Sequence, residues 1–151
     1  MKKILQISPN IRINQNDKKF YGIDLIKYEN KKNLNIDIIR YKTNFYKSYK
    51  IARKLENELA KNLIKYLNLV HGTYYSKKEW YIYVGYWLRR YSNIIVNRFL
   101  FIKHCSNISD EIFILKNKEK FFYVNDSLDF NHMSSNMMWN IALIEKILPY
   151  L

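Results

Sequence analysis

Glycine is scarce in this chain of 151 residues, which contains only Gly22, Gly72 and Gly85. Loops that cradle phosphate groups use closely spaced glycines, because the backbone must approach the anion without a side chain in the way. Three glycines so far apart allow neither a G-x-G-x-x-G turn nor a P-loop. The sequence therefore excludes a glycine-rich nucleotide site, and we expect no cofactor to be bound by this segment.

Cysteine and histidine are also few. Cys105 is the only cysteine, which excludes a disulfide framework and a cysteine-based metal site and is typical of a reducing cytoplasm. The three histidines are scattered and none has the H-E-x-x-H spacing of a zinc site. No G-x-S-x-G elbow occurs either. The sequence predicts no metal site and identifies no catalytic residue.

Long apolar runs are absent as well. The opening residues, MKKILQISPN, contain an apolar run too short for a signal peptide. No stretch approaches the ~20 apolar residues that span a bilayer, and the best candidate is interrupted by Arg89 and Arg90. We therefore expect a cytoplasmic protein that does not cross a membrane.

Acidic residues are outnumbered, since 13 Asp and Glu face 26 Lys and Arg, for a formal net charge of +13. Such a charge predicts an anionic partner: nucleic acid, a phosphorylated substrate or an acidic membrane surface. The charge is explained equally well, without any binding role, by A/T-rich codons. These codons encode the residue types in excess here, which are Lys, Asn, Ile, Tyr and Phe.

A hydrophobic fraction of 48% and an aromatic fraction of 17% indicate a folded chain of one domain's length.

The longest regular pattern covers residues 76–105 and predicts a central helix. Ser76 and Glu79 have the spacing of a capping box at its start. Apolar side chains then recur at helical spacing along one face that we expect to be buried. This face comprises Trp80, Val84, Trp87, Tyr91, Ile94 and Ile102.

Arg98 falls on the same face of this helix. A buried guanidinium needs a carboxylate or an anionic ligand beside it. A structural ion pair with Asp126, Asp129 or an acid elsewhere in the fold is the simpler interpretation, and contact with an anionic substrate is the alternative. Gly85, in the middle of the helix, predicts that another backbone passes close by.

A second helix is predicted over residues 48–68, with Gly72 as its C-cap after His71. Its expected inner face is a ladder of Ile51, Leu55, Leu59, Leu63 and Leu67. The opposite face is the most basic surface in the sequence, with Lys47, Lys50, Arg53, Lys54, Lys61 and Lys65 against Glu56 and Glu58. A solvated face is the usual meaning of such a pattern. The alternative is a surface that faces a membrane or another anion through Lys50, Lys54 and Lys61.

The remaining patterns predict short strands and a last helix. Apolar runs at residues 3–8, 36–41 and 111–115 are typical of strands, residues 121–124 are a further candidate, and residues 10–35 look irregular. The last helix is capped by Ser134 or Ser135 and ends in the apolar run LPYL. That run has nothing to bury it, so we expect the sequence to be truncated. Residue patterns alone therefore predict a basic α/β domain.

Residues 67–102 resemble the N-terminal part of a bacterial family of transferases encoded in O-antigen and other surface-polysaccharide loci. In that family a histidine, a serine, a tryptophan, a Gly-x-Trp and an arginine near the end of a long helix recur in this order. The matching residues here are His71, Ser76, Trp80, Gly85, Trp87 and Arg98. Asn97 departs from the pattern, which has an aspartate before the arginine, and this puts a paired-charge role for that dipeptide in doubt.

The resemblance covers residues 45–151 and implies a partial Rossmann-like fold of the GT-B N-terminal type, with a short parallel sheet and a long central helix. Residues 1–151 would then be a single, truncated N-terminal domain of a longer glycosyltransferase-like enzyme, inactive alone. The nucleotide-sugar donor would bind to the missing C-terminal part. Residues 1–151 would face a lipid-linked or phosphorylated glycan acceptor at the cytoplasmic side of the inner membrane. Arg98, His71 and Trp80 would be the substrate-binding residues.

A free-standing module that binds nucleic acid is the alternative function, suggested by the basic charge and the many tyrosines. Trp80, Trp87 and Tyr91 argue against it, because side chains on a buried face cannot stack on bases. We therefore favour the transferase.

Overall fold

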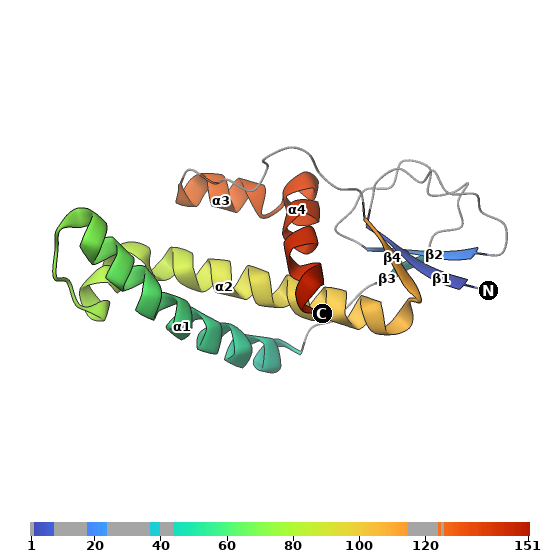
Figure 1. Cartoon of the computed structure of the whole chain (residues 1–151), viewed down its shortest axis with the longest axis horizontal. Helices are drawn as coiled ribbons and strands as arrows, with labels where there is room; N and C mark the ends of the chain where they lie inside the picture. The colour runs from blue at the N-terminus through green and yellow to red at the C-terminus, as the bar shows by residue number, and fades with distance from the viewer. Residues whose placement is uncertain (1, 8–17, 24–36, 40–43, 115–123, 125) are drawn as a thin grey trace. The chain divides into compact units, whose positions relative to one another are not determined.

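The computed structural model describes residues 2–7, 18–23, 37–39, 44–114, 124 and 126–151. The chain divides into two compact units, whose elements are labelled in Figure 1. Met1–Lys42 and Phe99–Leu151 form the first, here called the sheet unit. Thr43–Arg98 form the second, here called the hairpin unit.

The sheet unit contains four short strands, each parallel to its neighbours, in the order β3-β2-β1-β4. The strands are β1 (Lys2–Gln6), β2 (Lys18–Ile23), β3 (Asp37–Ile39) and β4 (Glu111–Phe113). Asp110 joins β4 to β1 by two bonds: its N–H donates to the Lys3 carbonyl at 2.8 Å, and its carboxylate accepts from the Lys3 N–H at 2.7 Å. The short strand β4 is thereby anchored by the residue that precedes it.

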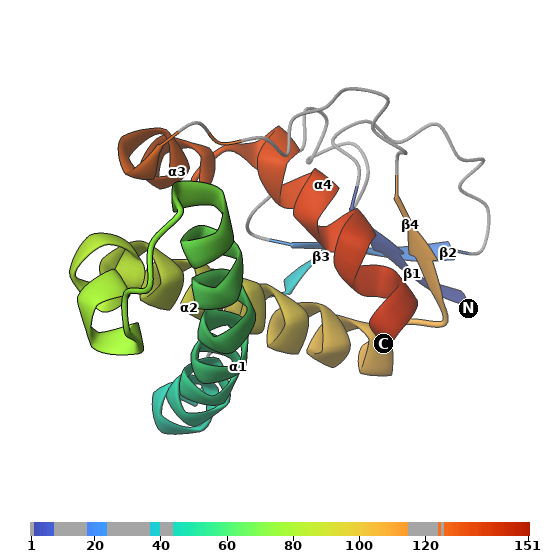
Figure 2. The same cartoon turned by 60° about the vertical axis from the view of Figure 1, so that its left-hand side comes forward.

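Apolar burial holds the sheet unit together. Leu5 and Ile7 are two positions apart, so they share one face of the sheet, and both are fully buried. Helix α4 (Met137–Ile147) lies beside the sheet (Figure 2). Its residues and the end of helix α2 (Lys77–Ile108) complete the core, which comprises Leu5, Ile7, Ile39, Phe101, Ile102, Cys105, Ile141 and Ile144. Each fully buried side chain of this size contributes about 1.5–3 kcal/mol.

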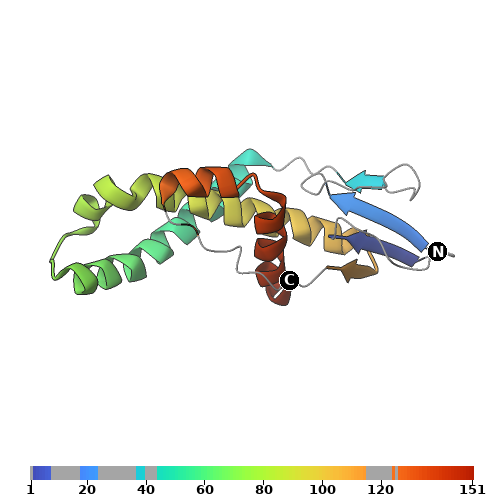
Figure 3. The ribbon, with the colours of Figure 1, turned by 90° about the horizontal axis from the view of Figure 1, so that it is seen from above.

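The hairpin unit consists of helix α1 (Phe45–His71) followed by the first part of α2 (Figures 1 and 3). Helix α1 begins at Asn44, whose side-chain oxygen accepts from the Lys47 N–H at 3.0 Å. It ends at Gly72, which has a φ of 61° and is the left-handed C-cap that the sequence predicts.

The capping box predicted at the start of α2 is confirmed. The Ser76 backbone N–H and hydroxyl both donate to one Glu79 carboxylate oxygen at 2.7 Å. The Glu79 N–H in turn donates to the Ser76 hydroxyl oxygen at 3.4 Å. These bonds occupy backbone groups that the first helical turn cannot pair internally, so the helix begins here.

The polar stretch around Asp126 contains a further helix, α3 (Ser127–Met133). The Asp126 carboxylate accepts from two backbone N–H groups of the first turn, both at 2.8 Å, and so acts as its N-cap. Helix α4 is capped by Asn136, whose side chain accepts from the Trp139 N–H at 3.1 Å, rather than by Ser134 or Ser135. The 3-10 turn η1 (Leu148–Tyr150) follows it.

The fold class expected from the sequence, an α/β Rossmann-like domain of the GT-B type, is wrong. The described chain is mostly helical: α1 has 27 residues and α2 has 32, whereas no described strand exceeds six. A Rossmann-type domain alternates strands and helices, because each crossover helix returns the chain to the sheet. Here the two longest helices follow one another, and residues 72–76 between them form no strand.

The positions of several elements agree with the sequence patterns. The central helix predicted over residues 76–105 is confirmed as α2. Strands β1, β3 and β4 overlap the runs predicted at residues 3–8, 36–41 and 111–115, with bounds that differ by at most two residues. The patterns missed β2, and the candidate strand at residues 121–124 lies outside the described residues except for its last position.

Candidate functional site

Asn68 organises the turn that joins α1 to α2. Its side-chain oxygen accepts from the Thr73 hydroxyl and the Tyr75 N–H, both at 3.0 Å, and from the Trp80 indole N–H at 2.8 Å. Its side-chain nitrogen donates to the Tyr75 carbonyl at 2.9 Å. The Asn68 carbonyl accepts from the Gly72 and Thr73 N–H groups. One residue thereby ties the end of α1, the connecting turn and the first turn of α2 together.

The structure brings together two of the three predicted substrate-binding residues. The His71 and Trp80 rings have centroids 5.6 Å apart and are tilted by 44°. Trp80 is 7% exposed and anchors the turn, whereas His71 is exposed. Arg98 lies 18 residues after Trp80 along α2, roughly 27 Å at 1.5 Å per residue. At this distance it does not join the other two in one site, and it is partly exposed rather than buried as predicted.

The buried face of α1 differs from the predicted ladder of large apolar residues. The buried positions are Ser48, Ala52, Glu56 and Ala60, four residues apart. The predicted ladder, Ile51, Leu55, Leu59, Leu63 and Leu67, lies one position earlier and is exposed or half-buried. Successive helical residues are 100° apart, so the prediction of this inner face was wrong by about a quarter turn. Helical periodicity identifies candidate faces, but only the packing neighbours decide which one is covered.

Glu56 is the charged residue in the middle of this buried face, with a side chain 1% exposed. A guanidinium nitrogen of Arg53 donates to one carboxylate oxygen at 2.5 Å. Arg89, on α2, brings its Nε to 3.7 Å from the other oxygen. The sequence suggested that Glu56 lies on the solvated face. The signal that points to burial is its position one turn from both Ala52 and Ala60.

The environment of this cluster changes the pKa of two neighbours of Glu56. The hydrogen bond to Glu56 raises the pKa of Arg53 above its usual value. Burial, and then the negative charge of Glu56, raise the pKa of Tyr81. Both carboxylate oxygens of Glu56 face a guanidinium, so the group is placed to link α1 to α2 as an ion pair rather than to accept a proton from a substrate.

Gly85 makes room for the Tyr81 ring one turn earlier on α2. A Cβ at position 85 would stand 2.9 Å from the Tyr81 Cδ1 atom and 3.3 Å from its Cβ and Cγ. The sequence predicted a close backbone at this glycine. Its nearest neighbour is instead this side chain, which reaches the Glu56 cluster.

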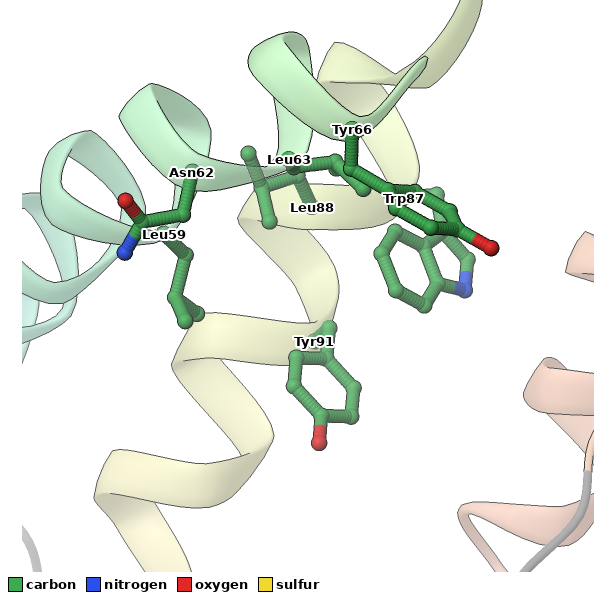
Figure 4. A pocket seen from close by; sticks show the side chains of 7 residues that line it. All are labelled: Leu59, Asn62, Leu63, Tyr66, Trp87, Leu88 and Tyr91. Carbon is green, nitrogen blue, oxygen red and sulfur yellow. The ribbon is translucent and has the colours of Figure 1, made fainter. Parts of the chain in front are cut away.

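An open groove of about 330 Å³ is formed by side chains of α1 and α2 (Figure 4). The rings of Trp87 and Tyr91 stack at one side of it, with centroids 5.2 Å apart and planes 12° apart. Burial raises the pKa of Tyr91. The lining is almost wholly apolar and comprises Leu59, Asn62, Leu63, Tyr66, Trp87, Leu88 and Tyr91. Its volume is at the lower end of ligand pockets, and it offers no charged group for catalysis.

Exposed lysines follow the outer face of α1, as the sequence predicts. This lysine stripe comprises Lys47, Lys50, Lys54, Lys61 and Lys65, all of them exposed. Glu58 lies on the same face and pairs with Lys61 at 2.9 Å, and the Lys50 ammonium lies 4.4 Å from the centre of the Tyr46 ring. The stripe extends over roughly 27 Å of helix, about three times the screening length at physiological salt. It is a basic surface that follows most of the length of α1.

The part of the chain that the structure describes contains neither a metal-binding cluster nor a membrane-spanning helix. No three His, Cys, Asp or Glu side chains there gather closely enough to bind a metal ion. None of its helices combines the length and the apolar character that crossing a bilayer requires.

Comparison with known proteins identifies the family. The model of the LIC12162 family transferases matches residues 26–151. No curated protein and no solved structure matches significantly. The family match covers well over half of the chain and includes the whole hairpin unit. The chain therefore belongs to the LIC12162 family of transferases.

Proposed function

We propose that this transferase adds a sugar to a growing surface polysaccharide of the O-antigen type, and that the hairpin unit faces the acceptor. The observation that carries the proposal is the transferase family match over residues 26–151. The similarity to transferases of polysaccharide loci, over residues 45–151, supports the narrower choice of sugar transfer.

A lipid-linked or phosphorylated glycan acceptor suits the charge of the hairpin unit. Such an acceptor lies at an anionic membrane surface, where each well-placed lysine or arginine contributes about 1 kcal/mol of binding. Lys50, Lys54 and Lys61 are exposed on one face of α1. In this proposal they hold the enzyme at the cytoplasmic side of the membrane, next to its acceptor.

His71 and Trp80, whose rings lie against each other at the turn between α1 and α2, are proposed to contact the acceptor. The exposed imidazole lies against an indole that Asn68 holds in place, so it is presented to a ligand at little conformational cost. Arg98, farther along α2, is proposed to bind an anionic group at a separate position. The donor is proposed to be a nucleotide sugar held mainly by residues outside this segment.

The test is sugar transfer by the full protein in the presence of anionic vesicles. The purified enzyme is offered radiolabelled nucleotide sugars and lipid-linked glycan, and incorporation and vesicle binding are both measured. The triple variant Lys50→Glu/Lys54→Glu/Lys61→Glu should lose vesicle binding and transfer together. The matched control reverses the same number of charges elsewhere, at Lys3, Lys103 and Lys146, and should retain both.

Two results would contradict the proposal. If no nucleotide sugar supports transfer, the reaction class is wrong; if the stripe variant binds anionic vesicles as well as the control does, the membrane role of the stripe is wrong. Tight binding of RNA with a steep dependence on salt would instead favour the nucleic-acid module.

A further inference from the structure

The turn between α1 and α2 exposes apolar side chains at its outer end. Tyr74 is 99% exposed, Leu69 is 81% exposed and Val70 is 57% exposed. These three residues, here called the apolar tip, lie in the last turn of α1 and in the connection that follows it, at one end of the hairpin (Figure 3). Exposed apolar side chains that gather in this way are typical of a contact surface.

The apolar tip is supported by a rigid frame. The hydrogen bonds of Asn68 to Thr73 and Tyr75 enclose Tyr74 from both sides. Trp80 packs its ring near Tyr75, with centroids 5.5 Å apart, and donates to Asn68. The backbone on both sides of Tyr74 is therefore fixed, so a partner that covers this side chain need not order the turn as well.

Positive charge surrounds the apolar tip. Leu69 follows Lys65 by four residues, so it continues the lysine stripe on the same face of α1. Lys78 is exposed in the first turn of α2. The nearby acid, Glu79, accepts hydrogen bonds from Ser76 and contributes one negative charge against these lysines. An apolar end bordered by lysines matches the chemistry of a lipid interface, in which acyl chains lie beneath anionic headgroups.

We propose that the apolar tip inserts into the acyl-chain boundary of an anionic bilayer while the lysine stripe rests on the headgroups. This inference builds on the proposed membrane-side function and adds a point of insertion and an orientation to it. Leu69, Val70 and Tyr74 enter the boundary, and Lys65 and Lys78 remain at the level of the phosphates because their long stems let the ammonium groups reach them. Tyrosine beside aliphatic residues is common at this depth of a bilayer.

A fluorescent label at position 74 tests the insertion. Cys105 is the only cysteine of the sequence and is buried, so a native-state label reacts with an introduced cysteine alone. The Tyr74→Cys variant is labelled with the environment-sensitive dye NBD and mixed with vesicles of phosphatidylglycerol and phosphatidylcholine. The Tyr46→Cys variant is the control, because Tyr46 is also an exposed tyrosine but lies at the start of α1, roughly 36 Å from Val70 along the helix.

Insertion predicts a blue-shifted, brighter NBD signal at position 74 that acyl-chain spin labels quench, and no such quenching at position 46. The variant Leu69→Ser/Val70→Ser should lower vesicle affinity roughly tenfold, with an unchanged far-UV circular dichroism spectrum. Vesicle binding without quenching at position 74 would overturn the insertion and leave the lysine stripe and the sugar transfer intact. A blue shift without lipid, together with a doubled mass in solution, would instead identify the tip as a contact between two copies and would also overturn the proposal.

Discussion

The sheet unit and the hairpin unit bury different kinds of side chain. The sheet unit encloses leucine, isoleucine and phenylalanine in one apolar cluster. Along α1, the hairpin unit encloses serine, alanine and a glutamate that pairs with two arginines. The large apolar residues of α1 lie instead in an open groove, as Leu59 and Leu63 do, or at the tip, as Leu69 does. The difference indicates that α1 is held in place by small side chains and polar contacts more than by the burial of large apolar residues.

The largest expected effect comes from deleting matched apolar volume in each unit. Ile144→Ala, in the fully buried cluster, should lower the free energy of unfolding by about 2–5 kcal/mol, because it leaves a cavity as well as losing burial. Leu59→Ala, beside the open groove, should cost only about 1 kcal/mol because water can fill the space. Urea unfolding curves measure both. Equal losses of stability would show that the two sites are packed alike and would contradict the difference between the two units.

The next effect concerns the charge that the hairpin unit buries. Glu56→Gln leaves Arg53 and Arg89 without their carboxylate, but both arginine side chains are partly exposed and can turn to water. We therefore expect a loss of about 1–3 kcal/mol, less than for a fully buried pair.

Glu56→Met sharpens this result, because it replaces the charge by an apolar chain of similar length. It should cost less than Glu56→Gln, since no polar group is left in the buried face. Urea unfolding at low and high salt compares the two variants. A methionine variant less stable than the glutamine variant would contradict this expectation and would mean that Arg53 and Arg89 need a polar partner at position 56.

The smallest effect is the pH dependence of the cap of α2. Hydrogen bonds from the Ser76 hydroxyl and then from its backbone N–H lower the pKa of Glu79 below its ordinary value of 4.5. A carboxyl group whose pKa is lower in the folded chain stabilises it fully above the ordinary value, and this stabilisation disappears as the pH falls through the folded value. Glu79→Gln should therefore lower the melting temperature at pH 7, and the difference from the parent chain should vanish in acid. A difference that persisted unchanged at acidic pH would contradict an ionised cap.

Features made by residues close in the chain were predictable. The Ser76–Glu79 capping box and the Gly72 C-cap involve bonds within a few residues, and both are confirmed. Asn68 was not identified, because its partners lie up to 12 residues away, across a turn whose path the sequence does not reveal. The predicted roles of Arg98, His71 and Trp80 in substrate binding stay predictions.

Sequence patterns alone predicted the end of α1 at Gly72, the start of α2 at Ser76 and the basic face of α1, and they excluded a glycine-rich phosphate loop and a cysteine-based metal site. Those properties depend on composition, periodicity and bonds between near neighbours. Only the tertiary structure decided that the chain is mostly helical, that Glu56 rather than Arg98 is the buried charge, and that alanines rather than leucines form the covered face of α1. These choices depend on which distant segment covers a surface, and helical periodicity is the same whichever face is covered.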